Sequence, residues 1–439
     1  MTTGTADRYT ADEELLNRSL SFQDRSQEIG QKAREAFREI RKSSTVTRNL
    51  ALSHAAEGLL DPSNQKKILE ANRKDIDAGI QAGMSSAMQD RLLLDGKRLK
   101  GIADSVLEIA AFPDPVGEII SGGVLINGIE MKKKRVPLGV VFTIYESRPN
   151  VTVDIGALSI KSGNAAILRG GKEALHSNTA LFEIFKEAVM KAGLPEYSLQ
   201  LVDDTDRAFM LALLKRDDLI DIVVPRGGEA LIKFTAANSR IPVIKHDKGV
   251  CNLFIDESAD LSHALEIAVN AKLQRPSVCN AIENLLIHEN CNFAGELLKG
   301  LADAGADLSG CGRTKKIFPS VRLIENPDEE YSMEFLDSRL SVKIVKDVDE
   351  AVSFIYSYGS GHSEAIVSKN TDSIERFSSS VDSSAVFINC STRFNDGGTM
   401  GMGAEVGIST GRLHVRGPMG VRDLTTTTYI MTGNGQIRS

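Results

Sequence analysis

The feature that most restricts the fold of this sequence is a repeated alternation of short β-branched runs with helical stretches. One alternating block covers residues 139–247, and its strand-like runs are 140–142, 165–168, 219–224 and 242–244. A second block covers residues 251–389, with runs at 251–255, 341–345 and 385–388. Strands that alternate with helices form parallel, doubly wound sheets, so we predict two α/β domains. The length of 439 residues also exceeds what one ordinary core accommodates.

Three further segments complete the expected organisation. Residues 28–112 have the apolar spacing of helices, with Thr47 and Asp61 as predicted caps. Asn127-Gly128 lies between two extended runs, which predicts a β-hairpin. The β-prone tail 424–431 has no partner near it in sequence. It either adds to the hairpin of another subunit or forms an edge strand in its own domain, and both interpretations stay open.

The composition excludes several classes of protein. A formal charge of −7 argues against a nucleic-acid or anionic-membrane surface, so we expect small-molecule partners. The 5 cysteines form no C-x-x-C pair, and the 7 histidines show no metal-ligand spacing, so we expect a reduced compartment and no metal. Residues 1–28 lack a signal peptide's basic start and apolar core, and no run of about 18 apolar residues occurs. We therefore expect a cytoplasmic protein.

Cys279 is the candidate nucleophile. It lies in L-Q-R-P-S-V-C-N (273–280), where the nearby Arg275 favours a thiolate, the form that attacks acyl carbon. A buried cysteine that acts as a small hydrophobe is the alternative, and for an isolated cysteine it is the better one. No histidine is close to Cys279 in sequence, so a Cys–His hydrolase would have to assemble in space.

Two Arg-Gly-Gly turns are candidate phosphate sites. Arg169-Gly170-Gly171 and Arg226-Gly227-Gly228 each follow a predicted strand and open a helix, where backbone amides and an arginine attract anions. A tight turn that needs glycine for backbone reasons is the alternative, and the repetition favours phosphate. Residues 401–407 do not have the spacing of the dinucleotide fingerprint, which disfavours a standard Rossmann dehydrogenase.

Other polar residues are candidates for substrate contacts. Residues 145–152 follow a strand and begin a helix, which places Arg148 and Asn150 where a parallel sheet opens its ligand crevice. Asn150 is also a candidate helix cap. Arg393 and Arg416 lie in glycine-rich segments and can hold a carboxylate or phosphate, although for each alone solvated surface charge is the usual role.

Six ordered segments together resemble one enzyme family. They are V-P-L-G-V-V-F-T-I-Y-E-S-R-P-N-V-T (136–152), I-L-R-G-G (167–171), V-P-R-G-G (224–228), Q-R-P-S-V-C-N (274–280), S-T-R-F-N-D-G-G (391–398) and H-V-R-G-P-M-G (414–420). In this order they resemble the gamma-glutamyl phosphate reductases, or glutamate-5-semialdehyde dehydrogenases, of the aldehyde dehydrogenase superfamily. Only residues 1 to about 28 fall outside the resemblance.

The resemblance implies an NADP-dependent oxidoreductase of proline biosynthesis. Such an enzyme reduces L-glutamyl 5-phosphate with NADPH to L-glutamate 5-semialdehyde and releases phosphate. For this chain the resemblance implies that Cys279 displaces phosphate to form a thioester. Hydride from NADPH would then give a thiohemiacetal that collapses to the aldehyde. An acylating aldehyde dehydrogenase with another acyl donor, such as a coenzyme A thioester, is the alternative. A silent scaffold that retains the fold is the third.

The resemblance also implies roles for individual residues. Cys279 and Asn280 are the implied catalytic residues, with the backbone amide of one of them as oxyanion donor, and Glu334 is implied at the nicotinamide ribose. The implied cofactor residues are Arg169, Gly170, Gly171, Pro225, Arg226, Gly227, Gly228 and Glu334. The candidate substrate residues are Glu146, Arg148, Asn150, Arg275, Arg393 and Arg416.

One segment departs from the wider superfamily. Hydrolytic members carry E-L-G-G-K upstream of the cysteine, where the glutamate activates water against the thioester. Here residues 245–250 read K-H-D-K-G-V. The missing glutamate suits an acyl group that is exchanged with phosphate, and His246 or Asp247 stays open as a base.

The expected architecture is aldehyde-dehydrogenase-like, with two doubly wound α/β domains and a small β arm for oligomerisation. The assignments are an N-terminal extension (1–28), a cofactor-binding domain (29–120 and 138–250), a catalytic domain (251–400), the arm (121–137 and 420–439) and a return to the cofactor domain (401–419). We expect a homo-oligomer, dimeric or tetrameric. Because the extension cannot hold a kinase domain, glutamate 5-kinase is expected as a separate, transient partner.

Overall fold

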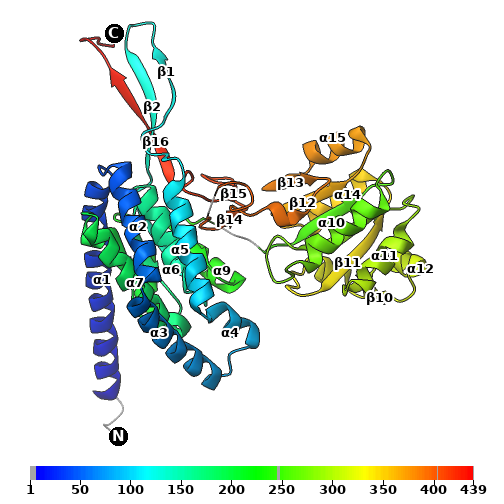
Figure 1. Ribbon diagram of the computed structural model, residues 1–439, viewed down its shortest axis with the longest axis horizontal. Coiled ribbons are helices and arrows are strands. Elements are labelled where there is room, and N and C mark those ends of the chain that lie inside the picture. Colours follow the sequence, from blue (N-terminus) through cyan, green and yellow to red (C-terminus); the bar gives the residue numbers. More distant parts are fainter. Residues whose placement is uncertain (1–5, 245–247, 403, 439) are drawn as a thin grey trace. The chain divides into compact units, whose positions relative to one another are not determined.

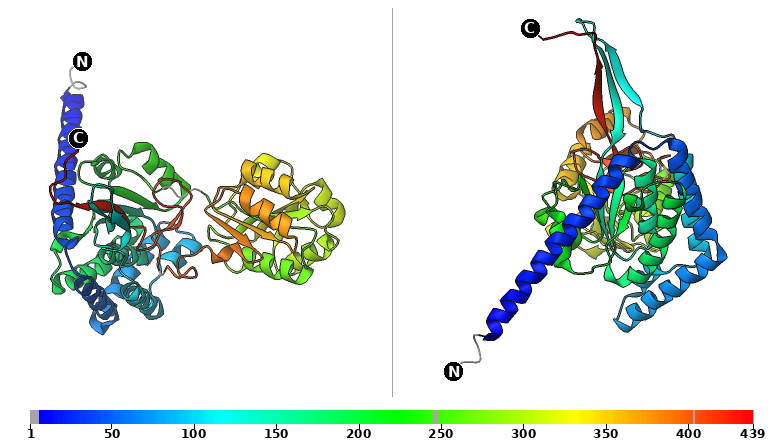
Figure 2. Two further views of the ribbon diagram at one scale, coloured as in Figure 1. Left: turned by 90° about the horizontal axis from the view of Figure 1, so that it is seen from above. Right: turned by 90° about the vertical axis from the view of Figure 1, so that its left-hand side faces the viewer.

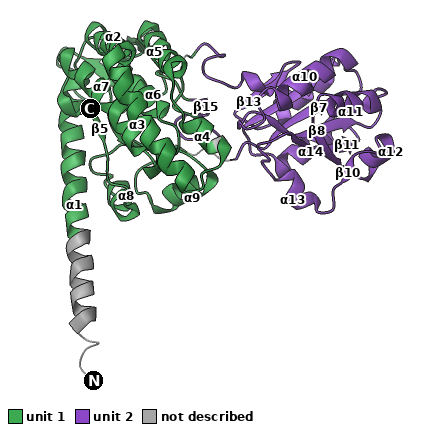
Figure 3. Cartoon of the chain, turned by 60° about the horizontal axis from the view of Figure 1, so that its bottom comes forward, with its two compact units in different colours: residues 1–245, 402–407, 419–439 green, residues 246–401, 408–418 purple. Residues whose placement is uncertain are grey.

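The computed structural model describes residues 6–244, 248–402 and 404–438, without the side chains of residues 6–19 and 87. The chain divides into two compact units (Figure 3). The first unit comprises residues 1–245, 402–407 and 419–439, and the second comprises 246–401 and 408–418. Each unit has its own parallel sheet, so the predicted mixed α/β fold is confirmed.

The first unit opens with a helical region made of α1 (Ala6–Ile40), α2 (Thr45–Leu60), α3 (Pro62–Gln81), α4 (Ser86–Leu92) and α5 (Gly96–Ala111). The cap prediction at Thr47 is wrong, because Ser44 accepts the Thr47 amide at 3.1 Å and the helix begins one turn earlier. Asp61 caps α3 as predicted, by accepting the amides of Ser63 and Asn64. None of the described helices has the length and apolar character needed to cross a membrane.

The sheet of the first unit has the parallel order β5-β4-β3-β6. Its elements are β3 (Val140–Tyr145), α6 (Asn150–Lys161), β4 (Ala165–Arg169), η1 (Lys172–Ala174), α7 (Leu175–Lys191), η2 (Glu196–Ser198), β5 (Leu199–Leu201), α8 (Arg207–Leu214), β6 (Ile222–Arg226) and α9 (Glu229–Asn238). Strands β3 and β4 are buried along their whole length, which explains their continuous apolar sequence. The predicted strand at 242–244 is reduced to a single bridge between Val243 and Val223.

A three-stranded antiparallel arm belongs to the first unit (Figures 1 and 2). Strands β1 (Ile119–Val124) and β2 (Glu130–Pro137) form a hairpin whose turn contains Gly128, at φ +84°. The tail forms β16 (Thr425–Thr432), which pairs with β2 of the same chain. The tail is therefore an edge strand of its own chain, which is the second of the two predicted alternatives.

The second unit has a parallel sheet in the order β10-β9-β11-β8-β7-β12-β13. Its strands are β7 (Cys251–Ile255), β8 (Ile282–His288), β9 (Asp307–Gly310), β10 (Arg322–Leu323), β11 (Arg339–Val345), β12 (Ser363–Val367) and β13 (Ala385–Ile388). Its helices are α10 (Leu261–Leu273), α11 (Ala294–Asp303), α12 (Gly312–Ile317), α13 (Pro327–Tyr331), α14 (Val348–Tyr358), α15 (Thr371–Ser380) and η3 (Thr392–Phe394).

The core of the second unit lies on both faces of this sheet. Alternate side chains of β7 enter different apolar clusters, with Leu253 and Ile255 in one and Phe254 in the other. The short strands β14 (Ile408–Ser409) and β15 (Gly417–Pro418) pair outside the main sheet. Of the segment 401–419 assigned from sequence to the cofactor domain, residues 408–418 lie in the second unit.

Candidate active site

In the second unit, the residues of interest lie at the amino edge of the parallel sheet. The loop with Cys279 joins the end of α10 to the start of β8. The loops with Gly249, Glu334 and His362 lead into β7, β11 and β12, which run parallel to β8. Because these strands share one direction, the loops before them meet at the same edge. This edge is the candidate catalytic region of the second unit.

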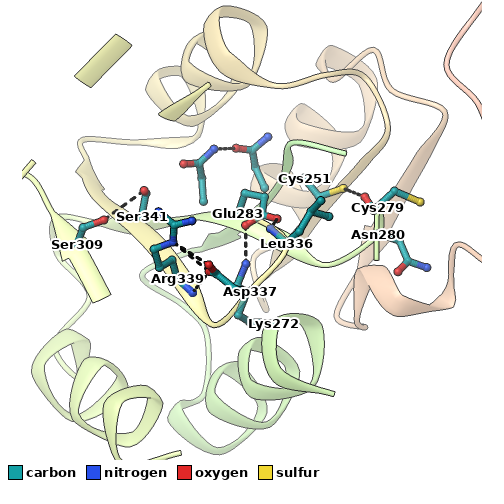
Figure 4. Close-up of polar contacts among 12 residues, drawn as sticks. Cys251, Lys272, Cys279, Asn280, Glu283, Ser309, Leu336, Asp337, Arg339 and Ser341 are labelled. Atoms are coloured by element: carbon teal, nitrogen blue, oxygen red, sulfur yellow. Dashed lines mark hydrogen bonds and ion pairs between the residues drawn. The ribbon is translucent and has the colours of Figure 1, made fainter. Parts of the chain in front are cut away.

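Cys279 is half-buried, and contacts with Cys251 and Gly249 hold its backbone in place. The buried Cys251 thiol donates to the Cys279 carbonyl at 3.1 Å (Figure 4). Burial raises the pKa of Cys251 well above its usual value, so this thiol keeps the proton that it donates. A Cβ added at Gly249 would lie 2.6 Å from the Cys279 Cα, so only glycine allows this close approach. Cys279 is thus presented on a fixed turn, which the Ala281 amide closes on the Val278 carbonyl.

The Asn280 side chain holds another segment against the nucleophile loop. Its Nδ2 donates to the Asn395 carbonyl at 3.0 Å, and its Oδ1 accepts from the Arg393 guanidinium. The Thr392 hydroxyl donates to the Asn280 carbonyl at 2.7 Å. The side chain is therefore engaged on both polar atoms, and the predicted catalytic role of the backbone amide stays a prediction.

Of the two candidate substrate arginines around the nucleophile loop, Arg393 has charge interactions with both Cys279 and Arg275. Arg393 Nε donates to Gln274 Oε1 at 2.7 Å, so the guanidinium contacts residues on both sides of the nucleophile. Burial lowers the pKa of Arg393, Asp396 and Cys279 raise it, and the charge of Arg275 lowers it further. Arg275 itself is exposed. The structure thus brings the Arg393 guanidinium to the cysteine, and the substrate contacts of Arg393 and Arg275 stay predictions.

Within the described part of the chain, Arg416 contacts Asp382 and not the residues around Cys279. Its Nη1 and Nη2 contact Asp382 Oδ1 at 2.7 Å and the Asp382 carbonyl at 2.9 Å. Arg412 pairs with the same carboxylate. Arg416 therefore ties the segment 408–418 to the start of β13, and its predicted substrate contact stays a prediction.

Glu334 is half-buried in the loop before β11. Two residues later, the Leu336 amide donates to Glu283 Oε1 at 3.4 Å, and Glu283 pairs with Lys272 at 2.5 Å (Figure 4). Sequence reasoning missed this pair. Its signal was a charged residue in each of two apolar runs, A-K-L (271–273) and A-I-E-N (281–284).

The candidate cofactor residues of the first unit lie at the carboxyl edge of its sheet, where parallel sheets bind ligands. Arg169 ends β4 and is only 8% exposed. Its Nη2 donates to the Thr205 and Asp206 carbonyls at 2.8 and 3.3 Å, while its buried Nε has no hydrogen-bond partner among the described residues. A Cβ at Gly170 or Gly171 would overlap the Asn178 or Glu173 side chain, so a larger residue at either position would displace one of these side chains.

The second Arg-Gly-Gly turn follows β6. Gly227 and Gly228 are exposed, after the buried Pro225 and the half-buried Arg226. The Gly228 amide, predicted as an anion donor, donates to Glu146 Oε2 at 2.9 Å. The start of α9 thus holds a carboxylate of its own chain. A carboxylate oxygen of Glu146 therefore accepts from the amide that was predicted to bind a phosphate oxygen.

Arg148 and Asn150 lie beside this turn, at the start of α6. Arg148 is exposed, and its carbonyl accepts from the Val151 amide. The capping interpretation of Asn150 is wrong, because Pro149 is the N-cap residue and no side chain caps α6. Asn150 Nδ2 instead donates to Asp154 Oδ2 at 2.9 Å, and burial raises the pKa of Asp154 to about 6.

Lys245, His246 and Asp247, which stand where the superfamily has E-L-G-G, lie outside the described residues. The base proposed there therefore stays a prediction. Within the described ranges, no group of three or more His, Cys, Asp and Glu side chains is arranged to hold a metal ion.

Comparisons with known proteins agree on one family. The model of the aldehyde dehydrogenase family matches residues 9–309. A gamma-glutamyl phosphate reductase of Leptospira biflexa is 52% identical over 413 residues, 93% of this chain and 97% of the relative. One from Clostridium perfringens is 46% identical over 411 residues, 93% of this chain and 98% of the relative.

Solved structures lead to the same assignment. The crystal structure of gamma-glutamyl phosphate reductase from Thermotoga maritima superposes with a TM-score of 0.91 at 40% identity, over 94% of this chain and 100% of that chain. An acetylating aldehyde dehydrogenase of Geobacillus thermoglucosidasius shares the fold at 15% identity, with a TM-score of 0.69 over 96% of this chain and 99% of that one. The chain therefore belongs to the gamma-glutamyl phosphate reductase family, within the aldehyde dehydrogenases.

Proposed function

We propose that this chain reduces L-glutamyl 5-phosphate with NADPH to L-glutamate 5-semialdehyde and releases phosphate, as a glutamate-5-semialdehyde dehydrogenase of proline biosynthesis. The observation that carries the proposal is the fixed presentation of Cys279 on a turn bonded to Cys251, with the Arg393 guanidinium close enough to interact with its charge. A fixed thiol next to a cation is suited to attack on an acyl group that bears negative charge. The names of the relatives supply the choice of acyl donor.

The proposed chemistry divides one difficult step into easier ones. The Cys279 thiolate attacks the acyl carbon, the carbon–oxygen bond to phosphate breaks, and phosphate leaves with the bonding electrons. NADPH, when bound, supplies the hydride that reduces the resulting thioester. The thiohemiacetal oxygen then forms the carbonyl as the carbon–sulfur bond breaks. Cys279 returns to the thiolate, and the aldehyde is free.

The Asn280 amide is the proposed oxyanion donor. The Cys279 carbonyl accepts the buried Cys251 thiol, and no described peptide bond is cis. A trans peptide points its N–H opposite to its carbonyl, so the Asn280 N–H points away from Cys251. This direction supports a donor that faces the developing charge on the substrate oxygen.

The proposed cofactor residues have features that fit a dinucleotide. Gly227 and Gly228 leave an exposed turn at the carboxyl edge of the sheet, and Arg169 has a buried Nε with no partner among the described residues. We assign Arg169, with its neighbouring glycine turn, to the phosphate and ribose region. Glu334 of the second unit would accept from the nicotinamide ribose.

The sequence before Cys279 supports exchange of the acyl group with phosphate. Residues 245–250 lack the glutamate of E-L-G-G-K, which supports a thioester that reacts with phosphate and not with water.

We also propose that the chain forms a homo-oligomer and receives its unstable substrate by transient contact with glutamate 5-kinase. The arm supports the first point, because every residue of β1 is exposed. Light scattering of the chain with and without residues 425–439, and co-purification with the kinase, test these two points.

The direct test is the reverse reaction. We expect the chain to turn over NADP+ with L-glutamate 5-semialdehyde in the steady state only when phosphate is present, and more slowly with NAD+. Coenzyme A in place of phosphate is expected to support no reaction. Activity with coenzyme A but not with phosphate would assign the chain to the acylating aldehyde dehydrogenases instead. Cys279→Ser is expected to lose turnover while it still binds NADPH, and turnover by this variant would overturn the mechanism.

A further inference from the structure

A buried ion pair closes the base of the nucleophile loop. Lys272 is in the last turn of α10, and Glu283 is the second residue of β8, so the two flank the loop that contains Cys279. Lys272 Nζ lies 2.5 Å from Glu283 Oε2, and both side chains are completely buried (Figure 4). The two ends of the loop are thus joined by one polar contact inside the core.

Stability alone does not explain this pair. Taking two charges out of water costs much of the energy that their attraction returns, and well-packed apolar residues are often as stabilising or better. Burial raises the pKa of Glu283 to about 7 and lowers the pKa of Lys272, so the environment opposes both charges. Buried pairs of this kind can define one arrangement among several of similar packing energy. The other contacts of Glu283 indicate which arrangement the Lys272–Glu283 pair defines.

The second oxygen of Glu283 contacts the loop that contains Glu334. Glu283 Oε1 accepts from the Leu336 amide at 3.4 Å, and Leu336 has the left-handed φ of +58°. The charge of Glu334 also raises the pKa of Glu283, which places Glu334 electrostatically next to the pair. Lys272 Nζ lies 5.8 Å from the centre of the Phe335 ring. One carboxylate is therefore bonded both to the end of α10, where the cysteine loop begins, and to the 334–336 loop.

Both loops belong to the second unit, and both contain a residue that the proposed reaction uses. Cys279 would carry the thioester carbon, while Glu334 would hold the ribose of the nicotinamide. The hydride must pass between these two positions, and a displacement of about 1 Å at such a site can cost on the order of 100-fold in rate. A contact that fixes one loop against the other therefore bears directly on hydride transfer.

We propose that Lys272 and Glu283 are positioning residues that set the separation between the Cys279 thioester and the nicotinamide ring. The pair touches neither substrate nor cofactor and acts through the two loops that it joins. This inference rests on the proposed function, because the roles of Cys279 and Glu334 come from it. It adds two residues to the machinery of that reaction.

The test replaces the pair by apolar side chains of similar volume. Lys272→Met with Glu283→Leu in one protein is expected to keep the thermal stability, because the replacements fill the same core space. The rate at which iodoacetamide alkylates Cys279 is expected to stay within about twofold, whereas kcat of the reverse reaction is expected to fall about 10- to 100-fold. A deuterium isotope effect on the transferred hydride is expected to increase, because the step that becomes slow is hydride transfer.

A matched control is the exposed pair Lys299 and Asp303 on α11, also 2.5 Å apart. Lys299→Gln with Asp303→Asn is expected to leave kcat and the isotope effect unchanged. If Lys272→Met with Glu283→Leu does not fold, Glu283→Gln preserves the shape of the side chain. Its single oxygen cannot accept from both Lys272 and Leu336, so a smaller loss of kcat in the same direction is expected.

Two results would overturn the proposal. One is a wild-type kcat and isotope effect in either folded variant. The other is an alkylation rate that falls in proportion to kcat, because the pair would then only hold the loop together. Failure of the proposed function is distinguishable, since the wild-type chain would itself show no phosphate-dependent reduction of NADP+. The alkylation and stability comparisons do not depend on that reaction.

Discussion

The buried carboxyl group of Glu364 predicts a specific dependence of stability on pH. Glu364 lies in β12 and is 0% exposed. Its Oε2 accepts from the Asn252 amide at 3.0 Å and from Asn252 Nδ2 at 2.7 Å, and its Oε1 accepts from Ser383 Oγ at 3.3 Å. Burial raises the pKa of Glu364 to about 8, and these hydrogen bonds only partly oppose the rise. At neutral pH the side chain is therefore protonated in the folded chain.

The sign of the effect follows from proton binding. Between the usual pKa of 4.5 and the folded value of about 8, the folded state binds a proton at Glu364 that the unfolded state has released. The free energy of unfolding contributed by this group therefore falls as the pH rises through that window. Within this window the free energy of unfolding falls by about 1.4 kcal/mol per pH unit. The total loss contributed by Glu364 above pH 8 is therefore roughly 5 kcal/mol.

Glu364→Gln isolates this contribution. The amide oxygen can still accept from Asn252, but it does not titrate, so the variant is expected to be more stable than the wild type at pH 8. The difference is expected to be several kcal/mol, roughly 5 at most, and to shrink toward zero near pH 5. Urea unfolding of both proteins at pH 5, 6, 7 and 8, followed by a probe in the second unit, measures it.

The control for this experiment is Glu375→Gln, which removes an exposed carboxylate on α15 of the same unit. It is expected to change the free energy of unfolding by less than about 0.5 kcal/mol at each pH. The reasoning would be refuted if Glu364→Gln were less stable than the wild type at pH 8. It would also be refuted if the difference between the two proteins did not vary with pH.

Three further substitutions test the site. Gly249→Ala places a methyl group against the Cys279 backbone, so we expect a destabilisation of about 1–3 kcal/mol and a kcat lowered about 100-fold, checked by urea unfolding and steady-state kinetics. Arg393→Lys cannot bond both neighbours of the nucleophile, so kcat/KM should fall about 10-fold, and an unchanged value would contradict the role of this contact. Cys251→Ala leaves the Cys279 carbonyl without its donor and should cost about 1–3 kcal/mol, whereas Cys251→Ser should recover part of that loss in the same unfolding assay.

Much of the fold was predictable because buried parallel strands have a distinct sequence. Strands β3 and β4 are continuous apolar runs, and both were expected near their observed positions. Strands of two or three residues, such as β5 and β10, carry no such pattern. Strand β12 was missed because it contains Glu364, a charged residue type whose burial depends on Asn252 in another strand.

The candidate site was predictable only as far as its local motif. Q-R-P-S-V-C-N identifies Cys279 and its neighbours, but the contacts that hold it come from distant parts of the chain. Thr392 and Arg393 are more than a hundred residues away in sequence, with separations of 112 and 113 from Asn280. A single sequence does not show which hydroxyl or guanidinium will arrive at the loop.

Charge alone was also a poor guide to the arginines. Arg393 and Arg416 have the same kind of glycine-rich surroundings in sequence. In the structure Arg393 contacts Asn280, whereas Arg416 is bonded to Asp382. The nearest carboxylate, supplied by the tertiary fold, distinguishes the two, and no local pattern encodes it.

The measurement that tests the central claim most directly is a pre-steady-state assay without phosphate. The wild-type chain is mixed with NADP+ and L-glutamate 5-semialdehyde, and formation of NADPH is followed. Because the Cys279 thioester has no acceptor, we predict a burst of about one NADPH per chain that then stops and turns over only when phosphate is added, and no burst with Cys279→Ser. Turnover that requires phosphate from the first cycle, with no burst, would contradict a thioester on Cys279.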